Sequence, residues 1–459
     1  GHDLAPAAEL GAAFDRAHAG LPRALRAERR AALLAGVRDL RLGDRYLAGI
    51  AEATVAVATQ AWFLHPRNRV LQELVRAGLP LYGLAQAYLD CAEGLVIGVS
   101  GSHGKSTTAA LVAALARRSP RFTTVRLAGN DRHHVPCLVE AATGEATDAL
   151  VLEVSNRQLL QMETAPPVAC LTNVTPNHLD EHGGLDGYVA VKRRLFELPG
   201  NRVAVRNGDD PLSRERCPAA ATAKEWRFAA AEAGLGVCDG AFEGDGAVVV
   251  RREGLLRERI PLHRLQLSGD HNRANVRAAV ATLAAVTELP PTAEAALAAF
   301  SPLRHRTQLV WQEAGVDWLD DLNSTTPQST LAAIRAAARP LVLLCGGEDK
   351  GLDFSELAQT VPDPVRRVVL LPGPGSDRIA QALTAAGRGA LVDRVATLDE
   401  AVARAAAAAA PGQVVLFSPA CPGVFHTFYG PDPGGRGFRA ALRSRRAAPT
   451  SPPRRRGPA

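Results

Sequence analysis

The sequence lacks the features that mark membrane-spanning, secreted and disulfide-stapled proteins. It has no run of about 18 or more apolar residues, so we expect no membrane span. The opening residues 1–4 show no basic stretch followed by an apolar one, so we expect no signal peptide. The seven cysteines are scattered, with no Cys-x-x-Cys pair. They indicate reduced thiols in a cytoplasmic protein rather than a disulfide framework or a zinc site.

The excess positive charge lies at one end of the chain. Of 53 lysines and arginines, six arginines fall within residues 443–459, which contain no acid, and the remaining 47 match the 47 aspartates and glutamates. We therefore expect a neutral globular body, a disordered basic tail over residues 443–459, and no nucleic-acid partner. A nucleic-acid-binding ATPase is an alternative that rests on this tail alone.

Apolar runs alternate with helical patterns along most of the 459 residues. This alternation predicts an α/β fold with parallel sheets covered on both faces, and the length suggests about three domains. We expect the domains at residues 1–93, 94–301 and 302–442, with a proline-bearing joint near 290–302 that would permit motion. The expected strands are 53–59, 79–82, 94–99, 149–154, 168–173, 341–345, 368–371 and 414–418, and the expected helices are 69–77, 109–118, 272–286 and 401–410.

A glycine-rich turn follows the apolar run 94–99 and leads into an alanine-rich helix. Strand, glycine turn and helix together make a phosphate cradle, because backbone N–H groups and the helix N-terminus face the anion. Lys105 would reach the terminal phosphates, and the Ser106 hydroxyl suits Mg²⁺. Only two residues separate Gly101 from Gly104, whereas the standard P-loop has four. We predict a nucleotide site; the alternative is an ordinary strand–helix turn with a serine cap.

Polar side chains follow several other expected strands. Glu153 closes a buried strand, where its carboxylate could hold Mg²⁺ or simply form a salt bridge. His178 follows the next strand, and Lys192 lies on a later helix, where a lysine is normally solvated. A turn begins at Asn207, and Asn272 shares a helix face with the asparagine three residues on. Each feature alone is ordinary.

Taken in order, however, the motifs resemble one family, the ATP-dependent Mur ligases of peptidoglycan synthesis, over about residues 1–442. Within it, the likeness is to the type that adds glutamate to UDP-N-acetylmuramoyl-L-alanine. The motifs are Gly-Ser-His-Gly-Lys-Ser-Thr-Thr, Glu-Val-Ser, Asn-Val-Thr-x-x-His-Leu-Asp, Tyr-x-x-x-Lys, Asn-x-Asp-Asp, Gly-x-His-Asn-x-x-Asn, His-Arg and Ser-Pro-Ala-Cys.

The resemblance implies a cytoplasmic, monomeric enzyme that forms an amide bond through an acyl phosphate, with ATP, two Mg²⁺ ions and a carbamylated Lys192. It implies an N-terminal Rossmann-like domain for the UDP substrate, a central P-loop ATPase-type parallel sheet and a C-terminal Rossmann-like domain for the amino acid. The implied nucleotide-binding residues are Gly101, Ser102, His103, Gly104, Lys105, Ser106, Thr107, Asn272, Arg306 and Asp321. The implied catalytic residues are Lys105, Glu153, His178 and Lys192, the metal ligands are Ser106, Glu153, His178 and Lys192, and the substrate contacts are Asp3, Asn130, Ser155, Thr325 and Lys350.

The chain departs from the family pattern in its two outer regions. It begins where the family's second strand would end, so we expect the opening strand, glycine-rich turn and helix to be absent and the first domain to be weakened. In the third domain, Asn323 replaces a lysine of the usual motif, and Pro422-Gly423 replaces a serine. Asn177 also replaces a common aspartate. Lys350 is retained, which favours an acidic amino acid of either hand.

These departures leave two alternatives to a glutamate ligase of the usual type. One is a relative that adds L-glutamate or another amino acid to a related acid. The other is an inactive nucleotide-binding paralogue, although the presence of Lys105, Glu153, His178 and Lys192 speaks against it.

Overall fold

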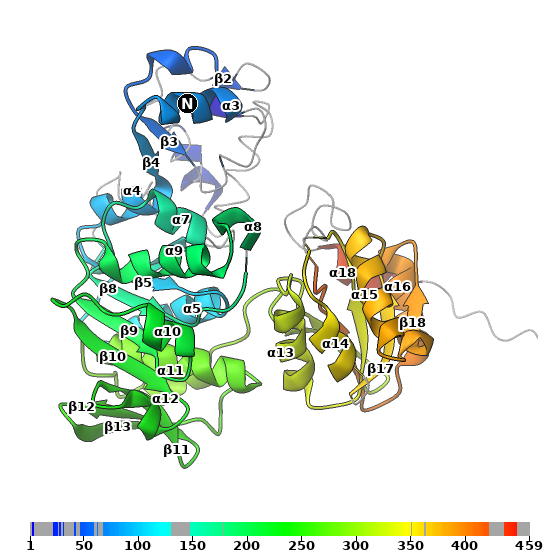
Figure 1. Cartoon of the computed structure of the whole chain (residues 1–459). Helices are drawn as coiled ribbons and strands as arrows, with labels where there is room; N and C mark the ends of the chain where they lie inside the picture. Colours follow the sequence, from blue (N-terminus) through cyan, green and yellow to red (C-terminus); the bar gives the residue numbers. More distant parts are fainter. Residues whose placement is uncertain are drawn as a thin grey trace, which may run out of the picture. The chain divides into compact units, whose positions relative to one another are not determined.

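The chain forms two compact units in the computed structural model (Figure 1). The first comprises residues 1–265 and 272–300, and the second comprises 266–271 and 301–459. The division of residues 1–301 into two further domains stays a prediction. The structure describes residues 2–3, 22–25, 27–28, 31, 41–42, 46–58, 62, 68–129, 147–177, 179–349, 351–361, 364–421 and 436–447.

The first unit is built on a nine-stranded sheet in the order β13-β12-β11-β10-β9-β8-β5-β7-β6. The strands from β6 to β11 run parallel, and β12 and β13 add an antiparallel edge. The expectation of a purely parallel sheet is therefore wrong at this edge. The strands are β5 Leu95–Ser100, β6 Val125–Gly129, β7 Ala149–Glu153, β8 Val168–Leu171, β9 Val203–Asn207, β10 Lys224–Ala229, β11 Asp239–Gly244, β12 Ala247–Arg252 and β13 Leu255–Pro261.

Helices cover both faces of this sheet (Figure 1). Every residue of β7 and β8 is buried, as expected for central parallel strands. Alternate strand residues such as Val96 and Leu152 pack against α7 and α9, whereas α5 contacts β5, β6 and β7 outside that core. The helices are α5 Lys105–Ala116, α7 Asn156–Gln161, α8 Leu179–His182, α9 Leu185–Glu197, α10 Pro211–Arg216, η5 Glu232–Leu235, α11 Asp270–Ala284 and α12 Ala293–Ala298.

Two short parallel strand pairs lie in the N-terminal part of the first unit. β1 pairs with β2, and β3 pairs with β4. The strands expected at 53–59 and 79–82 are present as β3 and β4, and the helix expected at 69–77 is α3. The elements are β1 His2–Asp3, β2 Arg41–Leu42, η2 Ile50–Glu52, β3 Ala56–Ala58, α3 Arg69–Arg76, β4 Leu81–Gly83 and α4 Leu84–Cys91.

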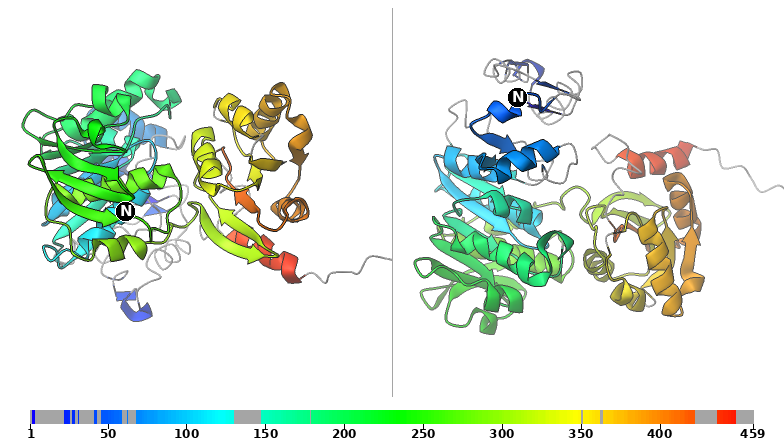
Figure 2. Two further views of the ribbon diagram at one scale, coloured as in Figure 1. Left: turned by 90° about the horizontal axis from the view of Figure 1, so that it is seen from below. Right: turned by 45° about the horizontal axis from the view of Figure 1, so that its top comes forward.

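The second unit contains a six-stranded sheet in the order β14-β15-β19-β16-β17-β18, in which only β14 is antiparallel to its neighbour. One face packs against α16 and α18, and the other against α13, α14 and α15 (Figure 2). The elements are β14 Gln308–Glu313, β15 Val316–Asp320, α13 Pro327–Ala337, β16 Leu341–Cys345, α14 Ser355–Thr360, β17 Val365–Leu370, α15 Pro374–Ala385, η6 Gly389–Leu391, β18 Val392–Arg394, α16 Leu398–Ala408, β19 Val414–Phe417 and α18 Arg436–Ala447.

The basic tail begins later than the sequence predicts. Residues 443–447 form the last part of α18 rather than a disordered segment, because this helix packs on the sheet through Phe438 and Leu442. Residues 448–459 lie outside the described residues. Among the helices that the structure describes, none has the length and apolar character needed to cross a bilayer.

Candidate functional site: a phosphate loop and two convergent lysines

The loop between β5 and α5 can be built only with glycine at two positions. Gly101 and Gly104 have φ angles of +147° and +80°, which side-chain-bearing residues rarely adopt. A Cβ atom on Gly101 would lie 1.9 Å from Oγ1 of Thr172, and one on Gly104 would lie 2.2 Å from Oδ1 of Asn275. The loop is therefore packed tightly against α11 and against the segment that follows β8, as a backbone cradle for an anion requires.

The segment that follows β8 holds this loop by backbone and side-chain hydrogen bonds. The His103 N–H donates to Oδ1 of Asn173 at 2.9 Å, and the His103 carbonyl accepts from Oγ1 of Thr172 at 2.6 Å. The Ser102 N–H donates to the Asn173 carbonyl at 2.9 Å, and its Oγ donates to the Thr175 carbonyl at 3.0 Å. Sequence reasoning pointed to the loop but missed this brace, because its partners lie some 70 residues apart in the chain.

Two lysines converge on a single carbonyl oxygen of the loop. Nζ of Lys105 donates to the Gly101 carbonyl at 3.0 Å, and Nζ of Lys192 donates to the same oxygen at 2.9 Å. Lys192 is only 1% exposed, so the solvated position that is ordinary for a helix lysine does not apply. Burial and the positive charge of Lys105 lower the pKa of Lys192 well below its ordinary value, which the negative charge of Glu153 partly offsets.

Tyr188 belongs to the same cluster, one helical turn before Lys192. Its hydroxyl lies 3.0 Å from Oγ of Ser102, and its ring centre lies 5.3 Å from Nζ of Lys192. Spacing of four residues on α9 brings both side chains to the loop. The Tyr-x-x-x-Lys motif was the sequence signal for this residue.

Oxygen ligands suited to Mg²⁺ border the loop on two elements. Glu153 ends β7 and is 3% exposed, and its strand pairs with β5 so that Glu153 faces Val99. Ser106 is buried in the first turn of α5, together with Thr107. A carboxylate and a hydroxyl fit a hard cation that binds through oxygen. No cluster of three His, Cys, Asp or Glu side chains able to hold a metal occurs within the described ranges, which do not include His178.

The first residues of α11 link this helix to α5. Nδ2 of Asn275 donates to Oδ1 of Asn272 at 3.3 Å, and Oγ1 of Thr108 donates to Oδ1 of Asn275 at 3.3 Å. The predicted shared face of the two asparagines is therefore confirmed. Asn272 is thus linked through Asn275 to α5, the helix that follows the phosphate loop.

In the second unit, Asp321 holds the turn that carries Arg306. His305 and Thr307, on either side of Arg306, have φ angles of +59° and +48°. Oδ1 of Asp321 accepts from the Thr307 N–H at 2.9 Å, and Oδ2 accepts from Oγ of Ser418 at 2.8 Å. Burial raises the pKa of Asp321 to about 6. Both carboxylate oxygens thus have partners within their own unit.

The remaining predicted residues fall into three groups. Ser155 caps α7 in a reciprocal capping box with Gln158, and Thr325 is half-buried just before α13, whose own cap is Thr326. Asp3 lies in β1, where the structure describes the backbone alone. Three residues, Asn130, His178 and Lys350, lie outside the described residues.

Fold and site together define an α/β protein with a P-loop-like phosphate cradle, joined to a second α/β unit. The family models agree with this class and refine it. The Mur ligase middle domain matches residues 99–283, and the glutamate ligase domain of the Mur ligases matches residues 305–421. The chain belongs to the Mur ligase family.

Similar proteins cover most of the chain. The UDP-N-acetylmuramoylalanine--D-glutamate ligase of Symbiobacterium thermophilum is 34% identical over 409 residues, which are 87% of this chain and 86% of that protein. An enzyme of the same name from Desulfitobacterium hafniense is 35% identical over 378 residues, covering 81% and 79% of the two chains.

Solved structures share the fold at lower identity. The UDP-N-acetylmuramate-alanine ligase MurC of Thermotoga maritima superposes with a TM-score of 0.61 at 15% identity, covering 92% of this chain and 91% of that one. The MurF ligase of the same organism, solved in complex with ADP, gives a TM-score of 0.59 at 16% identity, with coverages of 86% and 97%.

Proposed function

We propose that this chain is an ATP-dependent ligase that joins D-glutamate to UDP-N-acetylmuramoyl-L-alanine in peptidoglycan precursor synthesis. The observation that carries the proposal is the convergence of Lys105 and Lys192 on the Gly101 carbonyl of a phosphate loop. The substrate and the amino acid follow from the names of the relatives.

The chemistry needs a device that activates a carboxylate, which is a poor acyl donor at neutral pH. An oxygen of the substrate carboxylate attacks the γ-phosphorus of ATP, and ADP leaves, which gives an acyl phosphate. The glutamate amine then attacks the acyl carbon, loses a proton, and phosphate leaves from a tetrahedral intermediate. Negative charge builds on oxygen in both steps, and Lys105 at the start of α5 is positioned to stabilise it.

Lys192 suits carbamylation, and the reason is electrostatic. Two ammonium groups that share one carbonyl oxygen repel each other, and burial holds the pKa of Lys192 low. A neutral amine can add CO₂ and release a proton to form a carbamate, which replaces this repulsion by attraction to Lys105. With Ser106, Glu153 and His178, the carbamate would hold Mg²⁺, which when bound neutralises charge on the transferred phosphoryl group.

We assign the other roles by the same family pattern. Residues 1–93 would bind the UDP substrate, 94–301 ATP and 302–442 the amino acid, in a cytoplasmic monomer. The loop residues 101–107 would bind the phosphates. Asn272 would contact the adenine, and Arg306 and Asp321 the nucleotide from the third domain. The contacts on the other substrates would be Asp3, Asn130, Ser155, Thr325 and Lys350.

Phosphate release from ATP tests the proposal directly. The full chain is incubated with UDP-N-acetylmuramoyl-L-alanine and D-glutamate, and we expect release that depends on both substrates and on Mg²⁺, with the amide product seen by mass spectrometry. Binding of ADP without turnover on any amino acid would contradict the ligase and favour an inactive paralogue.

The hand of the amino acid is the second question that the same assay answers. Asn323 and Pro422-Gly423 stand where the family pattern has a lysine and a serine, so the glutamate pocket differs from the usual one. The altered pocket does not by itself select one hand, so L-glutamate is the second candidate. Turnover with L-glutamate and none with D-glutamate would establish that candidate in place of the first.

A further inference from the structure

We propose that Asn207 and Asp210 are positioning residues that set the phosphate loop in its ATP-binding conformation, acting through residues 172–175. This inference rests on the proposed function, because it concerns the same nucleotide site. Neither residue belongs to the loop: Asn207 ends β9, and Asp210 caps α10 at the other end of the turn that joins them.

The turn holds the segment 172–175 by two hydrogen bonds. Oδ2 of Asp210 accepts from the Val174 N–H at 2.6 Å, and Nδ2 of Asn207 donates to the Thr172 carbonyl at 2.8 Å. β8 and β9 are parallel neighbours, so their carboxyl ends bring the two segments to the same edge of the sheet. One of these bonds is charge-assisted, which makes it the stronger of the two.

Residues 172–175 also bind the phosphate loop by hydrogen bonds. The N–H groups of Ser102 and His103, the His103 carbonyl and the Ser102 hydroxyl all bond to residues 172–175. A displacement of this segment would therefore move the loop N–H groups that an anion needs. The Asn207–Asp210 turn and the phosphate loop are coupled through one short piece of chain.

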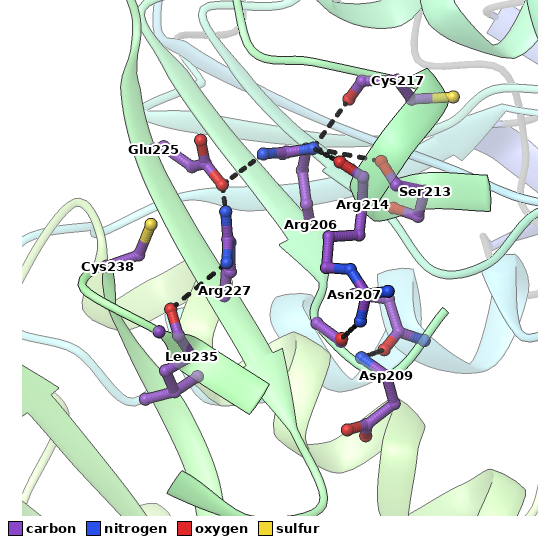
Figure 3. Close-up of polar contacts among 12 residues, drawn as sticks. Arg206, Asn207, Asp209, Ser213, Arg214, Cys217, Glu225, Arg227, Leu235 and Cys238 are labelled. Atoms are coloured by element: carbon purple, nitrogen blue, oxygen red, sulfur yellow. Dashed lines mark hydrogen bonds and ion pairs between the residues drawn. The ribbon is translucent and has the colours of Figure 1, made fainter. Parts of the chain in front are cut away.

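Further hydrogen bonds hold the turn and the helix that follows it (Figure 3). Asn207 also bonds within the turn, because its Oδ1 accepts from the Asp209 N–H at 2.9 Å. At the far end of α10, the Arg206 guanidinium donates to the carbonyls of Ser213, Arg214 and Cys217 at 2.9–3.2 Å. Arg206 also forms a salt bridge with Glu225, and its side chain is only 5% exposed. The helix that Asp210 begins is thus held at both ends.

A purely structural role is the alternative, since Oδ2 of Asp210 also caps α10 by accepting from the Ser213 N–H at 3.3 Å. Asp210→Ser separates the two roles. Serine is as good an N-cap as aspartate, but its side chain is too short for the hydroxyl oxygen to reach the Val174 N–H. Asp210→Asn keeps the length and an acceptor, and serves as the conservative rescue.

The test is ADP affinity of the full chain, measured by isothermal titration calorimetry with Mg²⁺. We expect Asp210→Ser and Asn207→Ala each to weaken ADP binding about tenfold, the effect of losing a hydrogen bond of this kind, and Asp210→Asn to lie between them and the wild type. Hydrogen exchange should speed up in peptides covering 100–105 and 172–175. Thr397→Ala, which removes the cap of α16 in the second unit, is the matched control and should leave ADP affinity unchanged.

An ADP affinity of Asp210→Ser within twofold of wild type, with unchanged exchange at 100–105, would overturn the positioning role. Wild-type chain that binds no ADP would instead overturn the proposed function. Because the readout is binding rather than turnover, the two failures are distinguishable.

Discussion

Gly104 combines a left-handed backbone with a neighbour too close for any side chain. Gly246, in the turn between β11 and β12, has a similar φ of +71° but nothing within 4 Å of its added Cβ. The two positions therefore separate backbone strain from steric overlap with Asn275.

We expect Gly246→Ala to lose about 1 kcal/mol of unfolding free energy from strain alone. Gly104→Ala should lose more and should also lose ADP binding, because Asn275 or the loop must move. Urea unfolding and calorimetric ADP titration measure the two effects. Equal stabilities and intact ADP binding in both variants would contradict the tight packing of the loop.

Lys192 makes the carbamate testable at one side chain. Lys192→Ala should abolish turnover, and short carboxylic acids added at millimolar concentration should restore part of it by supplying the missing carboxylate. Lys224→Ala is the control, because that lysine is 55% exposed and distant in the sheet order from β5. Full activity of Lys192→Ala without additive would exclude the carbamate.

Asp321 predicts a pH dependence of stability in the second unit. Burial raises the pKa of Asp321 to about 6 in the folded chain, whereas the pKa of an aspartate in an unfolded chain is about 3.9. The folded state thus binds the extra proton between about pH 4 and 6, so stability falls as the pH rises through this window, by up to about 3 kcal/mol. The urea midpoint of wild type relative to Asp321→Asn, measured at several pH values, checks this. A difference that does not vary with pH would contradict it.

At the scale of elements, the C-terminal end of α10 is held by a single buried arginine (Figure 3). Arg206 satisfies carbonyls at the end of the helix and pairs with Glu225, which also binds Arg227 at 2.7 Å. A helix end without such partners would leave carbonyls unsatisfied in a buried place.

Arg206→Ala should therefore cost about 3 kcal/mol of unfolding free energy. Arg214→Ala, which removes an exposed arginine paired with Glu215 on the same helix, should cost less than about 1 kcal/mol. Chemical denaturation of the two variants measures the contrast. Equal costs would show that the buried network does not stabilise α10.

At the scale of the whole molecule, each unit has its own hydrophobic core. Two such cores predict two calorimetric unfolding transitions rather than one. Arg206→Ala should lower one transition, and Trp318→Ala, which empties a site 1% exposed in the second unit, should lower the other. A single transition that both variants shift together would mean that the units unfold as one.

Local pattern predicted the fully buried strands β7, β8, β16 and β19 well. The strand expected at 341–345 coincides with β16, and the helix expected at 69–77 with α3, because continuous apolar runs and helical periodicity are properties of neighbouring residues. The strands at the sheet edges were missed, and so were the interior strands β10, β11, β12 and β15. β13 is mostly exposed and reads Leu-Leu-Arg-Glu-Arg-Ile-Pro, a mixture of polar and apolar residues that resembles a loop as much as a strand.

The sequence was sufficient to indicate the α/β class, the phosphate loop, and the family whose motifs occur in order along the chain. It could not show that Lys192 is buried against the Gly101 carbonyl, that residues 172–175 brace the loop, or that Asp321 bonds inward to Thr307 and Ser418. Lys192 and Gly101 lie 91 residues apart in the chain. Burial, shared partners and shifted pKa values arise only where the fold brings such distant residues together, so no local pattern encodes them.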